Sequence, residues 1–304
     1  FVARTKLAWV SYRINRIHSF IPKLVDAIRR RPQIAFELPN LSTIRNQESF
    51  NRKKLNDLLY ARQVIQDKLG SDPESDFFLL GWASIIEEVS NLRKDGRALR
   101  FVDKEDRPPV YWLLEEKWNS MLSDLVETEQ KLKSKDQNRV SWQIHNSDGR
   151  TLQCIGNNDL KYDLILYSPP YLNNLDYSEV YKLELWLSGF VTTSTQFKEL
   201  RQSTFRSHPS IKFQETDFVD NLLSNSWPKR LRDLLLLAIP KDEFHGARVR
   251  TVRAYMDDMF LALSKQFQRV KPGGHVVCVV GNSLHGNAHQ PILVATDLLI
   301  SALG

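Results

Sequence analysis

A short apolar run that stops at two consecutive prolines constrains the fold of this 304-residue chain more than any other feature. The run YDLILY, residues 162–167, is typical of a strand buried in a parallel sheet. It is followed directly by Ser168, Pro169, Pro170 and Tyr171. Because proline lacks a backbone N–H and has a fixed φ angle, the strand cannot continue past Tyr167. We therefore predict a rigid corner at the carboxyl end of a core strand, the edge where ligands bind in open α/β sheets.

The second half of the chain alternates between strand-like and helix-like segments. Residues 139–148 and 151–155 alternate as strands do, and residues 275–282 form a second buried-strand run. A helical segment near residues 176–188 and another at residues 250–270 separate these runs, and the second ends in a Lys-Pro-Gly-Gly turn. This order predicts βαβ units, a parallel sheet and the α/β fold class. None of the 12 glycines lies in a G-x-G arrangement, so the sequence lacks the phosphate-binding first turn of a complete doubly wound sheet.

The first half of the chain predicts helices. Residues 3–30 carry apolar side chains at helical spacing, as one helix or a broken pair, and Pro22 predicts a kink. Between residues 47 and 138 the sequence predicts a helical block without strands. In this block Gly70 ends one helix and Asp72 caps the next.

Composition and charge limit the classes of protein that fit. Hydrophobic residues make up 42% and charged residues 26%, an ordinary balance for a soluble protein. No apolar run approaches the roughly 18 residues of a membrane span, so no membrane is predicted. Cys154 and Cys278 lie in apolar runs and predict buried thiols in a reducing compartment, and the histidines show no spacing typical of metal ligands. The net charge of +6 permits a polyanionic partner without requiring one.

The corner at residues 168–171 combines a hydroxyl group, fixed carbonyl groups and an aromatic face. This combination suits a planar substrate that carries an amino group. The Ser168 hydroxyl and the Pro169 carbonyl can accept the two N–H bonds of the amine, while Tyr171 stacks on the ring. Holding both hydrogens directs the nitrogen lone pair out of conjugation with the ring and toward an electrophile. Such positioning replaces several kcal/mol of entropic cost.

The corner and the stretch that follows it, LNNLDYSEVYKLELWLSGF, resemble the catalytic segment of amino-methylating, site-specific DNA methyltransferases, which use S-adenosyl-L-methionine. The Ser-first form, SPPY, is most typical of cytosine-N4 enzymes, and an Asp-first or Asn-first form is typical of adenine-N6 enzymes. Five other stretches are similar to segments of this family: FVARTKL (1–7), SNLRKDGRALRF (90–101), HNSDGRTL (145–152), ELRQSTFRSHPS (199–210) and RVKPGGHVVCVVGNS (269–283).

The resemblance implies a partial Rossmann-like (class I) S-adenosylmethionine methyltransferase sheet with a helical insertion. Residues 1–46 would be N-terminal helices that continue the core, residues 47–138 a helical insertion and candidate target-recognition region, and residues 139–304 the catalytic half of the sheet. The family's glycine-rich cofactor loop would precede Phe1, and a closing strand pair would follow Gly304. We therefore expect either a segment of a longer chain or a subunit completed by a second polypeptide.

The resemblance also implies roles for individual residues. The catalytic residues would be Ser168, Pro169, Pro170 and Tyr171. Cofactor contacts would come from Asp148, Ser168 and Asn282, and DNA contacts from Tyr177, Arg201, Arg206 and His208. Plainer interpretations stay open for several of these residues: Asp148 and Asn282 are also typical of turns, and Tyr177 fits a core aromatic.

The sequence thus predicts an S-adenosylmethionine-dependent DNA methyltransferase that modifies the exocyclic amine of a flipped base, with cytosine N4 favoured over adenine N6. Transfer would be direct, in agreement with the absence of a Pro-Cys nucleophile motif. We expect it in the cytoplasm of a prokaryotic cell, associated with the nucleoid and with restriction–modification. Two alternatives remain: a catalytically inert methyltransferase-like subunit that binds nucleic acid, and an RNA or tRNA amino-methyltransferase.

Overall fold

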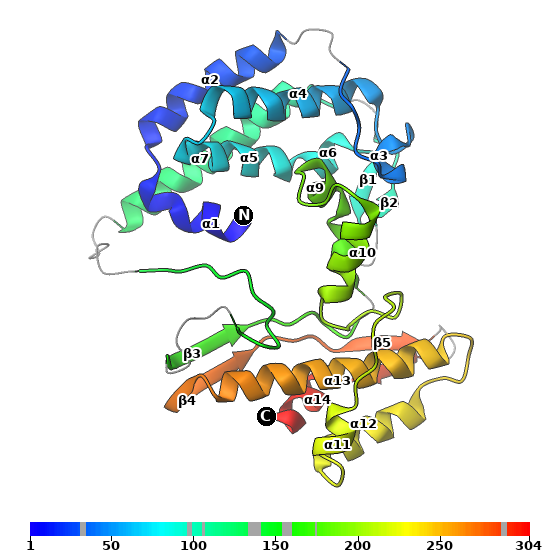
Figure 1. The fold of residues 1–304 in the computed structure, drawn as a ribbon. Helices are drawn as coiled ribbons and strands as arrows, with labels where there is room; N and C mark the ends of the chain where they lie inside the picture. The colour runs from blue at the N-terminus through cyan, green and yellow to red at the C-terminus, as the bar shows by residue number, and fades with distance from the viewer. Residues whose placement is uncertain are drawn as a thin grey trace. The chain divides into compact units, whose positions relative to one another are not determined.

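A computed structural model describes residues 1–30, 35–95, 99–104, 107–132, 141–153, 160–173, 175–286 and 291–304. These residues form two compact units (Figure 1). Unit 1 contains Phe1–Ile144 and Glu179–Phe197, and unit 2 contains His145–Ser178 and Lys198–Gly304. The proline corner belongs to unit 2, and part of the chain shortly after it belongs to unit 1. No helix in the described part of the chain is both long and apolar enough to cross a membrane.

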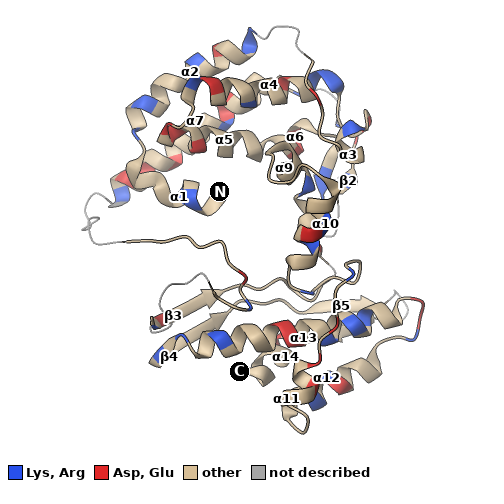
Figure 2. Cartoon of the chain, in the orientation of Figure 1, with Lys and Arg blue, Asp and Glu red and all other residues tan. Residues whose placement is uncertain are grey.

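Unit 1 is built mainly of helices, and Figure 2 shows that basic and acidic residues are interspersed along them. Its elements are α1 (Val2–Leu7), the 3-10 helix η1 (Ala8–Ser11), α2 (Ile14–Arg29), α3 (Ser42–Arg45), α4 (Arg52–Leu69), α5 (Pro73–Ser84), α6 (Ile86–Val89), β1 (Leu92–Lys94), β2 (Leu99–Phe101), α7 (Val110–Leu132) and α9 (Lys182–Leu187). Two further helices, α8 (Tyr177–Val180) and α10 (Ser194–Ser203), begin in one unit and end in the other.

Local signals set the ends of the helices in unit 1. The helix α4 begins after Asn51, whose side-chain oxygen accepts the backbone N–H of Lys53 at 3.0 Å. It ends at Gly70, where φ is +50°, a conformation that favours glycine. The helix α5 follows Asp72 and has Pro73 in its first turn, as the sequence predicts.

The structure refines one prediction for unit 1 and corrects another. Of the two alternatives for residues 3–30 it has the broken helix, with the break at Tyr12, where the backbone is extended, and α2 continues through Pro22. The block between residues 47 and 138 is not free of strands, because β1 and β2 pair antiparallel with Leu92 opposite Phe101. In the connection between α6 and α7, this short ribbon provides hydrogen-bond partners for backbone N–H and C=O groups that belong to no helix.

Aromatic side chains on α5 and α7 form the centre of unit 1. The rings of Phe78 and Trp118 are fully buried and meet edge to face, with centroids 5.1 Å apart. The indole N–H of Trp118 donates to the Phe78 carbonyl at 3.1 Å, and that of Trp82 donates to the Leu58 carbonyl at 2.7 Å. A Cβ atom at Gly81 would lie 2.5 Å from Trp118 Cδ1, so glycine is required for this close approach.

Unit 2 combines a parallel strand pair with helices. Its elements are β3 (Tyr162–Tyr167), α11 (Phe218–Leu222), α12 (Trp227–Ala238), α13 (His245–Phe267), β4 (Val270–Cys278), β5 (Ser283–Gly286), β6 (Pro291–Val294) and α14 (Thr296–Leu303). The strands β3 and β4 are parallel, as predicted, and β3 ends at Tyr167 directly before the prolines. The antiparallel pair β5–β6 is not anticipated by the sequence.

A bulge sets the register between β3 and β4. Tyr162 faces Val270, but Leu164 faces His275, so extra residues of β4 are accommodated between the two pairs. A Cβ atom at Gly274 would lie 2.9 Å from a carbonyl oxygen of β3. The Lys-Pro-Gly-Gly segment therefore lies inside β4 rather than in a turn before it, because glycine lets the bulge approach the neighbouring strand.

The two faces of the β3–β4 pair have different surroundings. On one face, Tyr167, Cys278 and Val280 pack against a core that includes Tyr255 and Met259 of α13. The opposite face carries four apolar side chains that are 43–64% exposed: Leu164, Leu166, Val277 and Val279. The helix α13 thus covers one face of the pair, and no described residue buries these four side chains.

Two strand predictions for the stretch before β3 are wrong for the residues that the structure describes. Residues 141–148 and 151–153 form no strand. An alternating sequence needs a partner strand to pair with, and residues 141–146 are exposed instead. Of the two cysteines, Cys278 is a half-buried free thiol and Cys154 lies outside the described residues.

Candidate active site

The proline corner places the Ser168 hydroxyl at the solvent-exposed end of β3. Ser168 Oγ donates to the Val279 carbonyl at 2.8 Å and lies 3.3 Å from Tyr171 Oη. Since this bond uses the hydroxyl proton, the lone pairs of Ser168 Oγ can accept an N–H donor. Pro169 is buried and Pro170 is half-buried, so the corner is anchored on one side and open at the hydroxyl.

Residues that follow β4 complete this edge of the sheet. The Tyr171 ring lies 3.3 Å from the position of a Cβ atom on Gly281, so glycine lets the ring approach the backbone closely. The exposed Asn282 follows, and its Oδ1 accepts the backbone N–H of Asp297 at 3.1 Å near the start of α14. Asn282 therefore stabilises a helix end with its oxygen, and its amide nitrogen is not used in that bond.

A cavity of about 140 Å³ lies beside the corner within unit 2. It is lined by Pro170, Leu175, Asp176, Tyr177, Thr204, Phe205, Ser207, His208 and Ile211. Tyr177 and Phe205 contribute aromatic rings, and Asp176 and His208 contribute polar groups. Two of the residues predicted to contact DNA, Tyr177 and His208, are therefore brought together next to Pro170.

An ion pair fixes the segment that follows the corner. Asp176 is only 4% exposed, and its Oδ2 accepts bonds from Arg201 Nη2 at 2.6 Å and Arg201 Nε at 3.1 Å. The backbone N–H of Ser178 donates to the other carboxylate oxygen at 3.0 Å. The guanidinium group of Arg201 thus faces a buried carboxylate, and the contact predicted for Arg201 with DNA stays a prediction.

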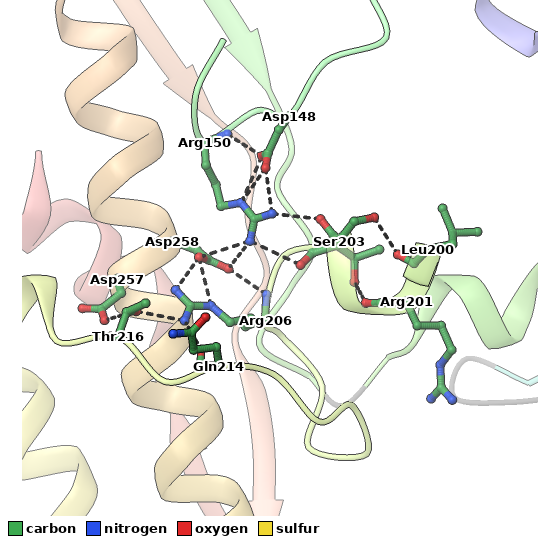
Figure 3. A network of polar contacts seen from close by, with 11 residues as sticks. Asp148, Arg150, Leu200, Arg201, Ser203, Arg206, Gln214, Thr216, Asp257 and Asp258 are labelled. Carbon is green, nitrogen blue, oxygen red and sulfur yellow. Dashed lines mark hydrogen bonds and ion pairs between the residues drawn. The ribbon is translucent and has the colours of Figure 1, made fainter. Parts of the chain in front are cut away.

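A network of charged side chains anchors the loop that forms the other wall of the cavity (Figure 3). Arg150 lies between two carboxylates, with Nη2 2.7 Å from Asp148 Oδ2 and Nη1 3.3 Å from Asp258 Oδ2. Arg206 Nη2 donates to Asp258 Oδ1 at 2.6 Å, and its Nη1 donates to Thr216 Oγ1 at 2.9 Å. Asp258 is 1% exposed and Arg206 is 7% exposed, so this network is largely buried.

These contacts bear on the roles predicted for Asp148 and Arg206. Both carboxylate oxygens of Asp148 accept hydrogen bonds from Arg150. Burial raises the pKa of Asp148, but the hydrogen bonds and charge of Arg150 outweigh it, so the pKa lies below its usual value. Asp148 is thus an ionised partner of Arg150, and Arg206 is a partner of Asp258. The contacts predicted for Asp148 with the cofactor and for Arg206 with DNA stay predictions.

Sequence reasoning missed Arg150 and Asp258, which organise the network. A signal for Asp258 is present in the sequence, because Asp257 and Asp258 lie inside a helical segment between the apolar Met256 and Met259. Carboxylates at core-facing positions of a helix are rarely buried without a charged partner. The identity of the partner cannot be read from the sequence, since Arg206 is far away along the chain.

The polar groups at the edge of the sheet can be tested against the cofactor that the resemblance implies. The Ser168 lone pairs and the Asn282 amide nitrogen fit a polar cofactor, because each has hydrogen-bonding capacity beyond its intramolecular bond. Asp148 fits less well, because Arg150 occupies both of its oxygens. Within the described ranges, no group of three or more His, Cys, Asp or Glu side chains could hold a metal ion.

The chain is similar to a curated protein, the Type II methyltransferase M.BsoBI of Geobacillus stearothermophilus. The two sequences are 27% identical, and the alignment covers 80% of this chain and 55% of the relative. The chain thus spans about half the length of the curated relative that it matches. No protein-family profile and no solved structure matches the chain.

Proposed function

We propose that this chain is part of an S-adenosylmethionine-dependent DNA methyltransferase that modifies the exocyclic amine of a flipped base, with cytosine N4 as the favoured target. The observation that carries the proposal is the Ser-Pro-Pro-Tyr corner directly after a parallel strand, with its Ser168 exposed and a cavity with aromatic walls beside it. The similarity to a Type II methyltransferase over most of the chain supports the same class of reaction.

The geometry of the corner supports an amine as the acceptor. The bond from Ser168 Oγ to the Val279 carbonyl leaves the oxygen free to accept one amine hydrogen, and the Pro169 carbonyl is the proposed acceptor for the other. We infer that Tyr171 stacks on the base. S-adenosylmethionine, when bound, supplies a sulfonium methyl group. Ser168 and the amide nitrogen of Asn282 are the proposed cofactor contacts, together with Asp148 if it exchanges its Arg150 partner.

Access to the amine requires that the base leave the duplex, because stacking hides it. The cavity beside Pro170 supports this step, since Tyr177 and Phe205 offer ring surfaces to an extruded base. Tyr177 and His208 are therefore the proposed contacts with the nucleic acid, and Arg201 and Arg206 would contribute by holding the cavity walls through Asp176 and Asp258. DNA is the proposed partner, and the remaining cofactor contacts are proposed to come either from another part of the same polypeptide or from a second polypeptide.

The test is substitution of the corner, assayed as transfer of tritiated methyl groups from S-adenosylmethionine to PCR-amplified duplex DNA. We expect Ser168→Ala and Tyr171→Ala to lower the rate by about 100-fold or more, because misplaced reacting groups cost about this much. Ser168 is exposed, so Ser168→Ala should change the free energy of unfolding by no more than about 0.5 kcal/mol. Ser264→Ala on α13, which removes a hydroxyl bonded within its own helix, is the matched control.

Unchanged activity in both corner variants would refute the catalytic assignment. Mass spectrometry of the digested DNA separates N4-methylcytosine from N6-methyladenine, and methyl transfer to tRNA but not to DNA would favour the RNA alternative. If the complete native polypeptide binds no S-adenosylmethionine in isothermal titration, the chain is an inert methyltransferase-like subunit.

A further inference from the structure

Asp258 occupies an unusual place for a carboxylate, in the middle of the long helix α13 with only 1% of its surface exposed. A buried carboxylate is costly unless charged donors compensate it. Asp258 has two such donors, Arg206 and Arg150. In addition, the backbone N–H of Arg206 donates to Asp258 Oδ2 at 2.8 Å. The carboxylate therefore holds both the main chain and the side chain of Arg206.

The residues next to Arg206 line the cavity beside the proline corner. Thr204, Phe205 and Ser207 all line the cavity, whereas Arg206 does not line it. The Arg206 side chain reaches Asp258 on α13 instead (Figure 3). Because the Arg206 peptide N–H is bonded to Asp258, the adjoining Phe205–Arg206 peptide cannot rotate freely. The orientation of the Phe205 ring thus depends on a carboxylate that does not touch the cavity.

Arg150 fixes the same wall from a second direction. Its Nη2 donates to the Ser203 carbonyl at 2.9 Å, and its Nη1 lies between the Thr204 carbonyl at 3.5 Å and Asp258. The guanidinium carbon of Arg150 also lies 5.6 Å from the centre of the Phe205 ring. Asp258 is therefore the common partner of both arginines that hold residues 203–206.

We propose that Asp258 is a positioning residue for methyl transfer: through Arg206 and Arg150 it fixes the Phe205 wall of the cavity beside Pro170, into which the target base enters. The inference rests on the proposed function, and it adds a residue distant from the reacting atoms. Asp258 contacts neither base nor cofactor in this arrangement. Its effect on the reaction passes through the position of residues 203–207.

The test compares Asp258→Asn with Asp220→Asn in the full chain. Asp220 on α11 also accepts two bonds from a buried arginine, Arg232, at 2.7 and 3.1 Å, and it does not line the cavity. Both changes remove a carboxylate partner from a buried arginine of unit 2, although Arg232 keeps Asp233 as a second partner. Asp220→Asn therefore controls for the loss of an arginine partner away from the cavity wall. Hydrogen exchange of residues 203–208 reports on the wall, and steady-state methylation of PCR-amplified duplex DNA reports on function.

For Asp258→Asn we expect exchange at residues 203–208 to be at least about tenfold faster and kcat/KM to fall by about 100-fold, since small displacements of a positioning group have effects of this size. Asp220→Asn should leave exchange at residues 203–208 unchanged and kcat/KM within about threefold of the wild type. Arg206→Lys keeps the positive charge but loses the bidentate hydrogen-bonding geometry of the guanidinium group. Its kcat/KM should therefore lie between those of the two aspartate variants.

The inference is overturned if Asp258→Asn leaves the exchange of residues 203–208 unchanged, or if its kcat/KM matches that of Asp220→Asn. Should Asp258→Asn fold poorly, Arg206→Lys decides the same question with the same two measurements. Absence of methyl transfer by the wild-type complete native polypeptide would refute the proposed function and the catalytic part of this inference. In that case the exchange comparison would still decide whether Asp258 fixes the cavity wall.

Discussion

The two units bury their apolar side chains to very different extents. In unit 1, Trp82, Phe78 and Trp118 are no more than 1% exposed, and the helices around them close a core of their own. In unit 2, the β3–β4 pair is covered by α13 on one face, while Leu164 and Leu166 on the other face are 54% and 64% exposed. The contrast is between a closed helical core and a strand pair that the described residues cover on one face only.

This difference can be compared with the amino-acid composition of β3. The run at residues 162–167 is apolar on both faces, as is typical of parallel strands covered by helices on both sides. The described residues supply a cover for the Tyr167 face alone. The sequence of β3 is therefore adapted to more burial than its described surroundings provide.

The largest expected effect on stability lies in unit 1. Trp118→Ala should lower the free energy of unfolding by about 3–5 kcal/mol, because it removes a fully buried ring and leaves a cavity against Phe78. Urea denaturation followed by far-UV circular dichroism measures this change. A loss below about 1 kcal/mol would contradict the description of unit 1 as a closed core.

A smaller effect is expected where the same core leaves no room. Gly81→Ala should cost about 1–3 kcal/mol, because the new methyl group would lie 2.5 Å from Trp118 Cδ1 and the buried indole has no space to move. The exposed Gly246, which has nothing within 4 Å of its Cβ position, provides a matched control. Gly246→Ala should leave the urea midpoint unchanged or raise it slightly, since alanine favours the helix.

The smallest effect is expected on the open face of β3. Leu166→Ser should change the free energy of unfolding of this chain by no more than about 0.5 kcal/mol, since the side chain is 64% exposed. It should also reduce self-association in analytical ultracentrifugation, because exposed apolar patches promote association. A loss comparable to that of Trp118→Ala would show that this face is covered in solution and would remove the contrast between the units.

Local signals in the sequence predicted much of the fold. The stop of β3 at two prolines, the glycine end of α4 and the Asp-Pro start of α5 depend on backbone chemistry alone, and the structure has each of them. Pairing could not be predicted in this way. The strands β1, β2, β5 and β6 depend on which segments meet in space, and the alternating residues 141–148 form no strand because the described structure supplies no partner.

In the candidate site, too, local features could be predicted from the sequence and contacts between distant residues could not. The corner at residues 168–171 is a local feature, and its place at the end of a parallel strand follows from its sequence. The roles of Arg201 and Arg206 depend on carboxylates that lie 25 and 52 residues away along the chain. A basic residue in a polar stretch has the same appearance whether it is exposed or paired with a buried acid, so only the structure reveals Asp176 and Asp258 as their partners.

The bulge at Gly274 limits which insertions and deletions the segment between Val270 and His275 can accept. Side chains alternate along a strand, so the extra residues of β4 decide which side chains of the rest of the strand point to α13. Loss or gain of a single residue between Val270 and His275 would turn Cys278 outward and shift the Val279 carbonyl away from Ser168. Apart from Gly273 and Gly274, whose backbone needs glycine, we expect this stretch to accept substitutions more readily than changes in length, and its spacing to the corner to be held constant among active relatives.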